Sequence, residues 1–344
     1  MNKLFDLIKK NIGLIIVLST FAVVIIAGLI NGSLIRAIDS IINADPFFIL
    51  LAVACFFGHI LFNSIANRSF INRQGYDLSL KGAFYSSLIG VYYSSITPAG
   101  TGGFPMQIYH LSRQGVPVGI ASSAVTCFIN AWYFMRLVLL TIFIFLRHDM
   151  LQGVLGNNMF FLILGYLYNI YVIVLFLVLG FVKMPVQLII GLIDKTIRKF
   201  HLSKDPDSIK LKLSETVERY HDAMQNILKY PSEIFKQLFF GCIYAILLNS
   251  IIFFAYRSVG LSASSYFDLF GMSLCQYIAS AYMPTPGGAG AQEIIFSLFF
   301  GSLIDRDHLL AVMLIWRFIS FYLILFSGAV MTGLKSLEKS DSEA

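Results

Sequence analysis

Two Pro/Gly-rich stretches decide how this chain folds: residues 92–105 read YYSSITPAGTGGFP, and residues 280–293 read SAYMPTPGGAGAQE. Each stretch interrupts a longer apolar run, 82–112 in the first case and 266–301 in the second. Proline lacks a backbone N–H donor and glycine favours open backbone, so a helix ends at each stretch. Each apolar run is therefore expected to form a hairpin of two helices.

The rest of the chain is too apolar for a water-soluble domain. Of its 344 residues, 57% are hydrophobic and 13% are charged, whereas soluble domains are about 25% charged. A membrane-spanning helix needs about 20 apolar residues, and six further runs qualify. We expect an all-α polytopic membrane protein whose full spans are 12–30, 46–66, 118–146, 159–182, 234–257 and 309–333.

These segments indicate a single integral membrane domain, 1–344, made of two halves. The first half, 1–182, holds the hairpin 82–112, and the second half, 234–344, holds the hairpin 266–301. Between them lies a polar segment, 183–233, with apolar residues at helical spacing on both sides of Asp205-Pro206. It predicts two amphipathic helices on the inner membrane surface. Its nine basic and seven acidic residues favour a solvated connector over a surface that recruits lipid or a partner.

Charge sets the expected orientation. The nine basic residues of 183–233 place this connector in the cytoplasm. Counting spans outward from it puts both chain ends in the cytoplasm, both ends of 82–112 inside and both ends of 266–301 outside. The two hairpins are then re-entrant from opposite faces, as in inverted-repeat transporters. The alternative is that the two breaks arose separately as packing devices.

An arginine follows each hairpin inside a long apolar run: Arg136 in NAWYFMRLVLL (130–140) and Arg317 in VMLIWRFISFY (312–322). A charge in the bilayer interior is unfavourable by several kcal/mol, so such residues are functional candidates. Each arginine can bind a ligand phosphate or cap the open carbonyls of a broken helix. Glu293 is expected to pair with Arg317 or Arg136, with the amine of a lipid headgroup as the alternative partner.

Three further residues and the glycines complete the candidate site. Gln107 follows the first break as Glu293 follows the second, and being neutral it makes the halves unequal. His110 and Arg113 lie where the first hairpin returns to the cytoplasm, as headgroup contacts or as topology anchors. After each glycine cluster, the free N–H groups that begin the second limb are expected to point toward the bilayer centre, where a phosphate can bind.

Enzyme and metal signatures are missing from the sequence. There is no HExxH, GxSxG or P-loop. The four cysteines, Cys55, Cys127, Cys242 and Cys275, lie in apolar segments without CxxC spacing. We therefore expect no catalytic residue, no bound metal, no cofactor and no nucleic-acid partner.

The segments TPAGTGGFPMQIYHLSRQGV (97–116), PTPGGAGAQE (284–293) and LIWRFISFY (314–322) resemble the transmembrane region of lysylphosphatidylglycerol synthase. This is the flippase-like part of the bacterial multiple peptide resistance factor, and the resemblance covers nearly the whole chain. Arg136 matches less cleanly, because many relatives carry an acidic residue soon after it and this chain has Leu137, Val138 and Leu139. The resemblance supports Thr97, Pro98, Gly100, Gly102, Gly103, Pro284, Pro286, Gly287, Gly288, Glu293 and Arg317 as motif residues.

The resemblance implies a function. In that family the membrane part is thought to move aminoacylated phosphatidylglycerol to the outer leaflet, which protects against cationic antimicrobial peptides. The soluble domain that transfers lysine is not found before the last residue, Ala344, so we expect this chain not to be a lysyltransferase by itself. A separate aminoacyl-lipid synthase and a second copy of the chain are the expected protein partners.

We therefore predict a lipid translocator of the bacterial inner membrane, with its site at the midplane between 97–103 and 284–293. The rivals are a membrane subunit that presents phosphatidylglycerol to a separate synthase, and a transporter of small solutes. The candidate lipid-binding residues are Thr97, Pro98, Gly100, Gly102, Gly103, Gln107, His110, Arg113, Arg136, Pro284, Thr285, Pro286, Gly287, Gly288, Glu293 and Arg317.

Overall fold

The computed structural model describes residues 25–26, 28–30, 32–199, 205–283 and 285–328, and these are helical, without a β-strand. The expected span 12–30 lies almost wholly outside the described residues, and so does Pro284. The helices are α2 (Ser33–Ile42), α3 (Pro46–Arg73), α4 (Leu80–Ile96), α5 (Gly103–Ser112), α6 (Val118–Leu146), α7 (His148–Leu155), α8 (Met159–Phe181), α9 (Lys183–Lys199), α10 (Pro206–Leu228), α11 (Pro231–Ser258), α12 (Tyr266–Ser280), α13 (Ala291–Phe300) and α14 (Leu309–Arg317), with short η1 (Gly156–Asn158) and η2 (Phe318–Tyr322).

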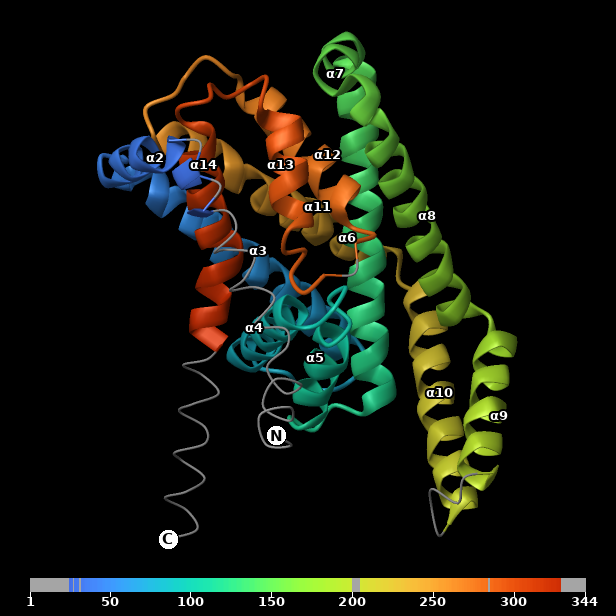
Figure 1. The fold of residues 1–344 in the computed structure, drawn as a ribbon. Coiled ribbons are helices and arrows are strands. Elements are labelled where there is room, and N and C mark those ends of the chain that lie inside the picture. Colours follow the sequence, from blue (N-terminus) through green and yellow to red (C-terminus); the bar gives the residue numbers. More distant parts are fainter. Residues whose placement is uncertain (1–24, 27, 31, 200–204, 284, 329–344) are drawn as a thin grey trace, which may run out of the picture.

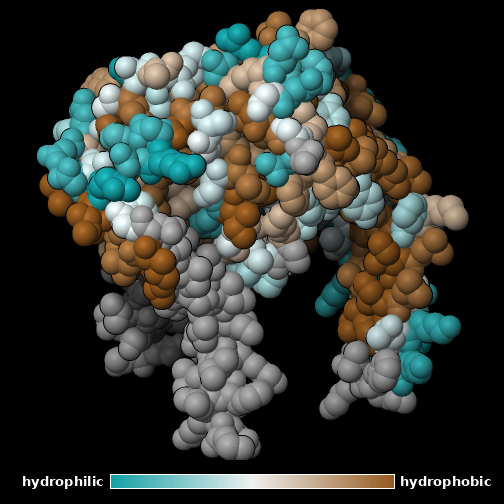
Figure 2. Space-filling model, turned by 45° about the horizontal axis from the view of Figure 1, so that its top comes forward, coloured by the Kyte–Doolittle hydropathy of each residue, from teal (hydrophilic) through white to brown (hydrophobic). Residues whose placement is uncertain are grey.

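Five helices are long and apolar enough to cross a membrane: α3, α6, α8, α11 and the helix Leu309–Gly328, which runs from α14 through η2. They confirm five of the six expected spans to within a few residues, except that α3 runs on to Arg73. The outer face of α8 carries large exposed apolar side chains such as Phe160, Leu167 and Tyr171, and Figure 2 shows hydrophobic surface along this side of the molecule. The chain is a multi-pass membrane protein.

Local sequence explains where these helices begin. Pro46 starts α3, and the Asp45 carboxylate accepts a hydrogen bond from the N–H of Phe47 at 2.9 Å. Ser79 caps α4 and Ser265 caps α12 through their hydroxyl groups. A capping side chain satisfies an N–H that the first turn of a helix leaves free, which fixes the start of the helix.

The two Pro/Gly stretches form the turns of two helix pairs, as predicted: α4 with α5 and α12 with α13. The limbs have 17, 10, 15 and 10 residues, and at 1.5 Å per residue the longest is about 25 Å, short of the roughly 30 Å hydrocarbon core. In Figure 1 the first pair (turquoise) lies in the lower half of the molecule and the second pair (orange) in the upper half. The turns meet, because Pro98 and Pro286 form an isolated antiparallel bridge.

The polar connector forms the two expected amphipathic helices, α9 and α10. They lie side by side and extend beyond the lower end of α8 (Figure 1). Helix α10 is held to the bundle by hydrogen bonds from the Ser123 hydroxyl to the Tyr220 carbonyl at 3.0 Å and between His221 Nδ1 and the Gly180 carbonyl at 2.9 Å. Helix α9 leaves Met184, Leu188 and Leu192 largely exposed. An uncovered apolar stripe of this kind favours contact with lipid over full exposure to water.

Candidate functional site

A cavity of about 290 Å³ lies where the two turns meet. Both helix pairs line it, together with α3, α6, α11 and the segment around Arg317. Its walls carry polar side chains from helices far apart in sequence, and aromatic rings from α6, α11 and α12. The polar wall residues used below are His59, Asn63, Gln107, Asn249, Gln276 and Gln292.

The first turn is closed by its own threonine. The Thr97 hydroxyl donates to the carbonyl of Tyr93 at 2.7 Å and accepts the N–H of Gly102 at 2.9 Å. Gly103 starts α5 at a point where α5 touches α4: a Cβ there would lie 1.8 Å from the Ser94 hydroxyl oxygen and 2.7 Å from the Gly90 carbonyl oxygen. A residue without a side chain is therefore needed at this crossing.

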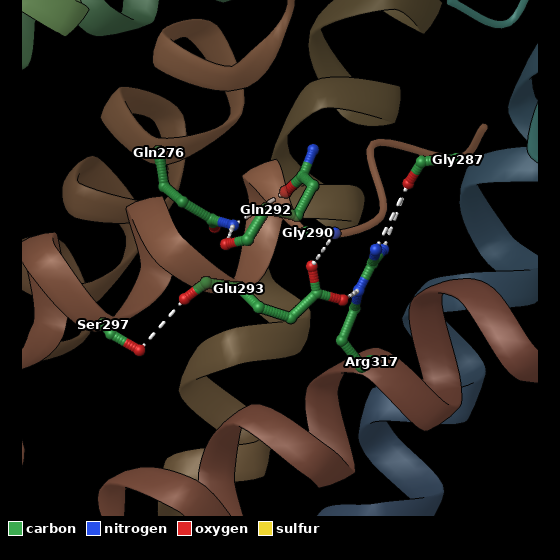
Figure 3. Close-up of polar contacts among 7 residues, drawn as sticks. All are labelled: Gln276, Gly287, Gly290, Gln292, Glu293, Ser297 and Arg317. Carbon is green, nitrogen blue, oxygen red and sulfur yellow. Dashed lines mark hydrogen bonds and ion pairs between the residues drawn. The ribbon is translucent and has the colours of Figure 1, made fainter. Parts of the chain in front are cut away.

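The second turn is held by a buried ion pair, as Figure 3 shows. Arg317 Nε lies 2.5 Å from Glu293 Oε1, and the side chains are only 6% and 10% exposed. The other carboxylate oxygen accepts the N–H of Gly290 at 2.8 Å, and the Arg317 guanidinium donates to the Gly287 carbonyl at 3.3 Å. The expected pairing of Glu293 with Arg317 is therefore formed, and Arg317 also caps a carbonyl of the broken helix. Arg317 lines the cavity at the same time.

A π-helical turn, Phe318–Tyr322, directly follows this arginine. Such turns widen a helix by one residue and are frequent at functional sites. Two polar atoms near it, the hydroxyl oxygens of Thr285 and Ser320, are buried without a hydrogen-bond partner among the described residues, and both residues line the cavity. The cavity therefore holds hydrogen-bonding capacity that the protein itself does not use.

Arg136 has a different environment from Arg317. Its side chain is fully buried, and Nη2 donates to the side-chain amide oxygen, Oδ1, of Asn169 in α8. The guanidinium carbon lies 4.4 Å, 4.6 Å and 4.7 Å from the ring centres of Trp132, Tyr133 and Tyr277. Among the described residues it forms no ion pair, and its Nε and Nη1 have no hydrogen-bond partner.

The remaining candidates divide into wall residues and distant ones. Gln107 is buried, lines the cavity and donates to the Ser87 hydroxyl at 3.3 Å. His110 packs beside Tyr85, with ring centres 5.4 Å apart, and Arg113 is exposed at the end of α5. Neither His110 nor Arg113 lines the cavity. Candidates that line it are Gly100, Gln107, Thr285, Gly287, Gly288 and Arg317.

Four N–H groups of the two turns, close to the start of each second limb, are already occupied by the protein itself. The N–H of Gly102 bonds the Thr97 hydroxyl and that of Gly290 bonds Glu293. The N–H of Gly103 and that of Ala289 bond carbonyls of their own turns. These four donors are not free for an anion, and binding of a phosphate by the other N–H groups that begin α5 and α13 stays a prediction.

Sequence reasoning missed the walls that α3, α11 and α12 contribute. A signal was present in α3, where His59, Asn63 and Asn67 recur every four residues within an apolar span and are all buried. Residues at this spacing share one helix face. A polar face on a membrane-spanning helix points to a bundle interior or a cavity.

Fold and site together define a multi-pass membrane protein with a polar cavity between two opposed helix pairs. Residues 12–328 match the family described as the lysylphosphatidylglycerol synthase TM region, and the chain belongs to this family. It is also 25% identical to a "UPF0104 membrane protein" of Archaeoglobus fulgidus over 276 residues, which cover 75% of this chain and 77% of that relative. Membership of this family supports a role connected with membrane lipids.

Proposed function

We propose that this protein translocates a phospholipid headgroup between the two leaflets of the bacterial inner membrane. The observation that carries the proposal is the meeting of the two turns at Pro98 and Pro286, beside a polar cavity that lies among apolar spans. A polar headgroup cannot cross hydrocarbon without partners for its hydrogen-bonding groups. The cavity walls supply such partners at the point where the two helix pairs face each other.

The cavity is large enough to receive a headgroup. Its 290 Å³ is many times the roughly 10–15 Å³ that one water molecule needs on the same measure. The proposal is that the polar headgroup enters it and that the acyl chains stay outside in the bilayer. There the acyl chains would contact the exposed apolar faces of the spans.

The family description points to phosphatidylglycerol and its aminoacylated forms as the first lipids to test. If the lysyl form is the lipid moved, its outward movement would lower the negative charge of the cell surface and so protect against cationic antimicrobial peptides. The central experiment reconstitutes the purified protein in liposomes and follows the transbilayer movement of labelled phosphatidylglycerol and of its lysyl form. Movement above that of protein-free liposomes supports translocation. If neither lipid moves, stand-alone translocation is wrong, and the lipid-presenting subunit or the solute transporter replaces it.

A disulfide between the two turns should stop transport reversibly. Residues paired in an antiparallel bridge have Cα atoms about 4.5–5.5 Å apart, within the range that a disulfide spans. We expect Pro98→Cys/Pro286→Cys, made in a background without the four native cysteines, to cross-link under mild oxidation and to lose transport. Each single variant should keep its transport under the same oxidation, and reduction should restore the double variant. Undiminished transport by the fully cross-linked protein would show that the turns need not separate.

Cysteine labelling tests the proposed re-entrant topology, on which the proposed cytoplasmic placement of the chain ends depends. Four exposed positions flank the helix pairs: Asp77 and Arg113 around the first, Ser262 and Ser302 around the second. With a membrane-impermeant maleimide, Ser262→Cys and Ser302→Cys should label in intact cells. Asp77→Cys and Arg113→Cys should label only after permeabilisation. If the two members of either couple fall on opposite sides, that helix pair crosses the membrane.

A further inference from the structure

The two buried arginines differ in how their positive charges are neutralised. Arg317 is neutralised by Glu293 at 2.5 Å, whereas Arg136 contacts an amide and three aromatic rings. Among the described residues that line the cavity there is no Asp, Glu or Lys. The site therefore carries one net positive charge, and that charge belongs to Arg136.

A single layer of aromatic rings separates this positive charge from the cavity. Trp132, Tyr133 and Tyr277 touch the guanidinium on one side and line the cavity on the other. A single aromatic layer of low polarity screens a charge poorly, so the potential of Arg136 reaches into the cavity. A buried cation without a counter-ion is unfavourable, and an anion in the cavity would relieve part of this penalty.

The cavity offers a cationic headgroup no corresponding binding site among the described residues. Both oxygens of Glu293 are engaged, one by Arg317 and the other by the N–H of Gly290. An ammonium group also binds the faces of aromatic rings, but Arg136 already lies over three of the rings that line the cavity. An ammonium there would meet a like charge and no free carboxylate.

We propose that the cavity selects a phosphodiester headgroup of net negative charge, such as that of phosphatidylglycerol, over its aminoacylated, positively charged form. This selectivity rests on the proposed translocation, because it concerns the same cavity. Arg136 is a positioning residue in it: it acts through its field across the aromatic layer. The groups that would hold the headgroup itself are the polar walls, including the hydroxyls of Thr285 and Ser320.

The sequence supplies a built-in probe for binding. Both tryptophans of the chain, Trp132 and Trp316, line the cavity, so intrinsic fluorescence reports its occupancy. We would titrate the detergent-solubilised protein with short-chain phosphatidylglycerol, phosphatidylethanolamine and lysylphosphatidylglycerol, and with inorganic phosphate. Phosphatidylglycerol is expected to bind at least about tenfold more tightly than the lysyl form, as one uncompensated charge at this range predicts.

The matched variant is Asn169→Asp. It keeps the shape of the side chain and places a carboxylate against Arg136, as Glu293 lies against Arg317. Because the net charge of the site is then removed, the preference for the anionic lipid should fall to within about twofold. Asn169→Leu loses the same hydrogen bond to the Gly165 carbonyl but leaves the positive charge, and should keep the preference. Gln152→Glu adds a carboxylate at an exposed position of α7 and should also keep the preference for the anionic lipid.

The outcomes separate selectivity from translocation. Equal or tighter binding of lysylphosphatidylglycerol by the unaltered protein overturns the selectivity, even if liposomes show transport. Phosphatidylglycerol preferred by the unaltered protein and lost in Asn169→Asp supports it. Binding of inorganic phosphate as tight as that of the lipid would keep the anion preference and replace the translocator by a small-solute transporter. If no phospholipid or phosphate changes the fluorescence, the selectivity fails, and transport in liposomes alone decides whether translocation stands.

Discussion

Arg317→Ala is expected to destabilise the protein by about 3–5 kcal/mol, because it leaves a buried carboxylate without its partner. Glu293 would keep only the Gly290 N–H among the contacts of its two oxygens, and the Gly287 carbonyl would lose its donor. The second turn should then open, and lipid transport should be lost with it. The measurement is the free energy of unfolding in mixed micelles, alongside transport in liposomes.

Two comparisons isolate the buried pair. Arg36 and Asp307 form an ion pair at 2.9 Å, but their side chains are 54% and 62% exposed, so Arg36→Ala should change the free energy of unfolding by less than about 1 kcal/mol. The double variant Arg317→Met/Glu293→Leu should be more stable than Arg317→Ala, since no unpaired charge remains buried. If Arg317→Ala unfolds like the Arg36 variant, the pair does not hold the turn.

Gly103→Ala should have the second-largest effect, a loss of about 1–3 kcal/mol from overpacking at the crossing of α4 and α5. The added Cβ would overlap the Ser94 hydroxyl and press on the Gly90 carbonyl. The first helix pair must open to admit it, which moves the first turn away from the second. We therefore expect weaker transport together with a lower free energy of unfolding.

A helical glycine in open space provides the control. A Cβ at Gly191 of α9 meets nothing within 4 Å, so Gly191→Ala should stabilise the protein by about 0.5–1 kcal/mol. Ser94→Gly should restore only part of the stability that Gly103→Ala loses. The Gly90 carbonyl belongs to the backbone and, unlike a side chain, cannot rotate away from the added Cβ. Full rescue would show that the Ser94 side chain alone sets the limit.

Much of the fold follows from local properties of the chain. Apolar runs of about 20 residues predict spans because the hydrocarbon core demands both length and internal hydrogen bonding, and five described helices agree with them. The Pro/Gly stretches end helices wherever they lie, so both turns were predictable. That Glu293 pairs with a buried arginine was predictable as well, since a buried charge needs a partner, but the sequence left Arg317 and Arg136 as alternatives and the structure selects Arg317.

The candidate site was predictable only in part. The turns and Arg317 belong to the cavity, but His110 and Arg113 lie away from it, at the far end of α5. The sequence did not reveal that Thr97 and Glu293 consume the N–H groups of the turns. Nor did it reveal that Arg136 meets three aromatic rings instead of a carboxylate. A local pattern contains no record of which long-range neighbour a side chain meets.

By itself, the sequence determined a membrane protein with helical spans, two broken hairpins and two buried arginines, because hydropathy, proline and glycine act through the chain's own neighbours. Only the tertiary structure decided that Pro98 meets Pro286, that α3, α11 and α12 complete the polar walls, and that one arginine is neutralised while the other is not. These features depend on packing between segments far apart in the chain, such as α3 with His59 and the segment with Phe321, where burial and electrostatic pairing are settled by three-dimensional proximity.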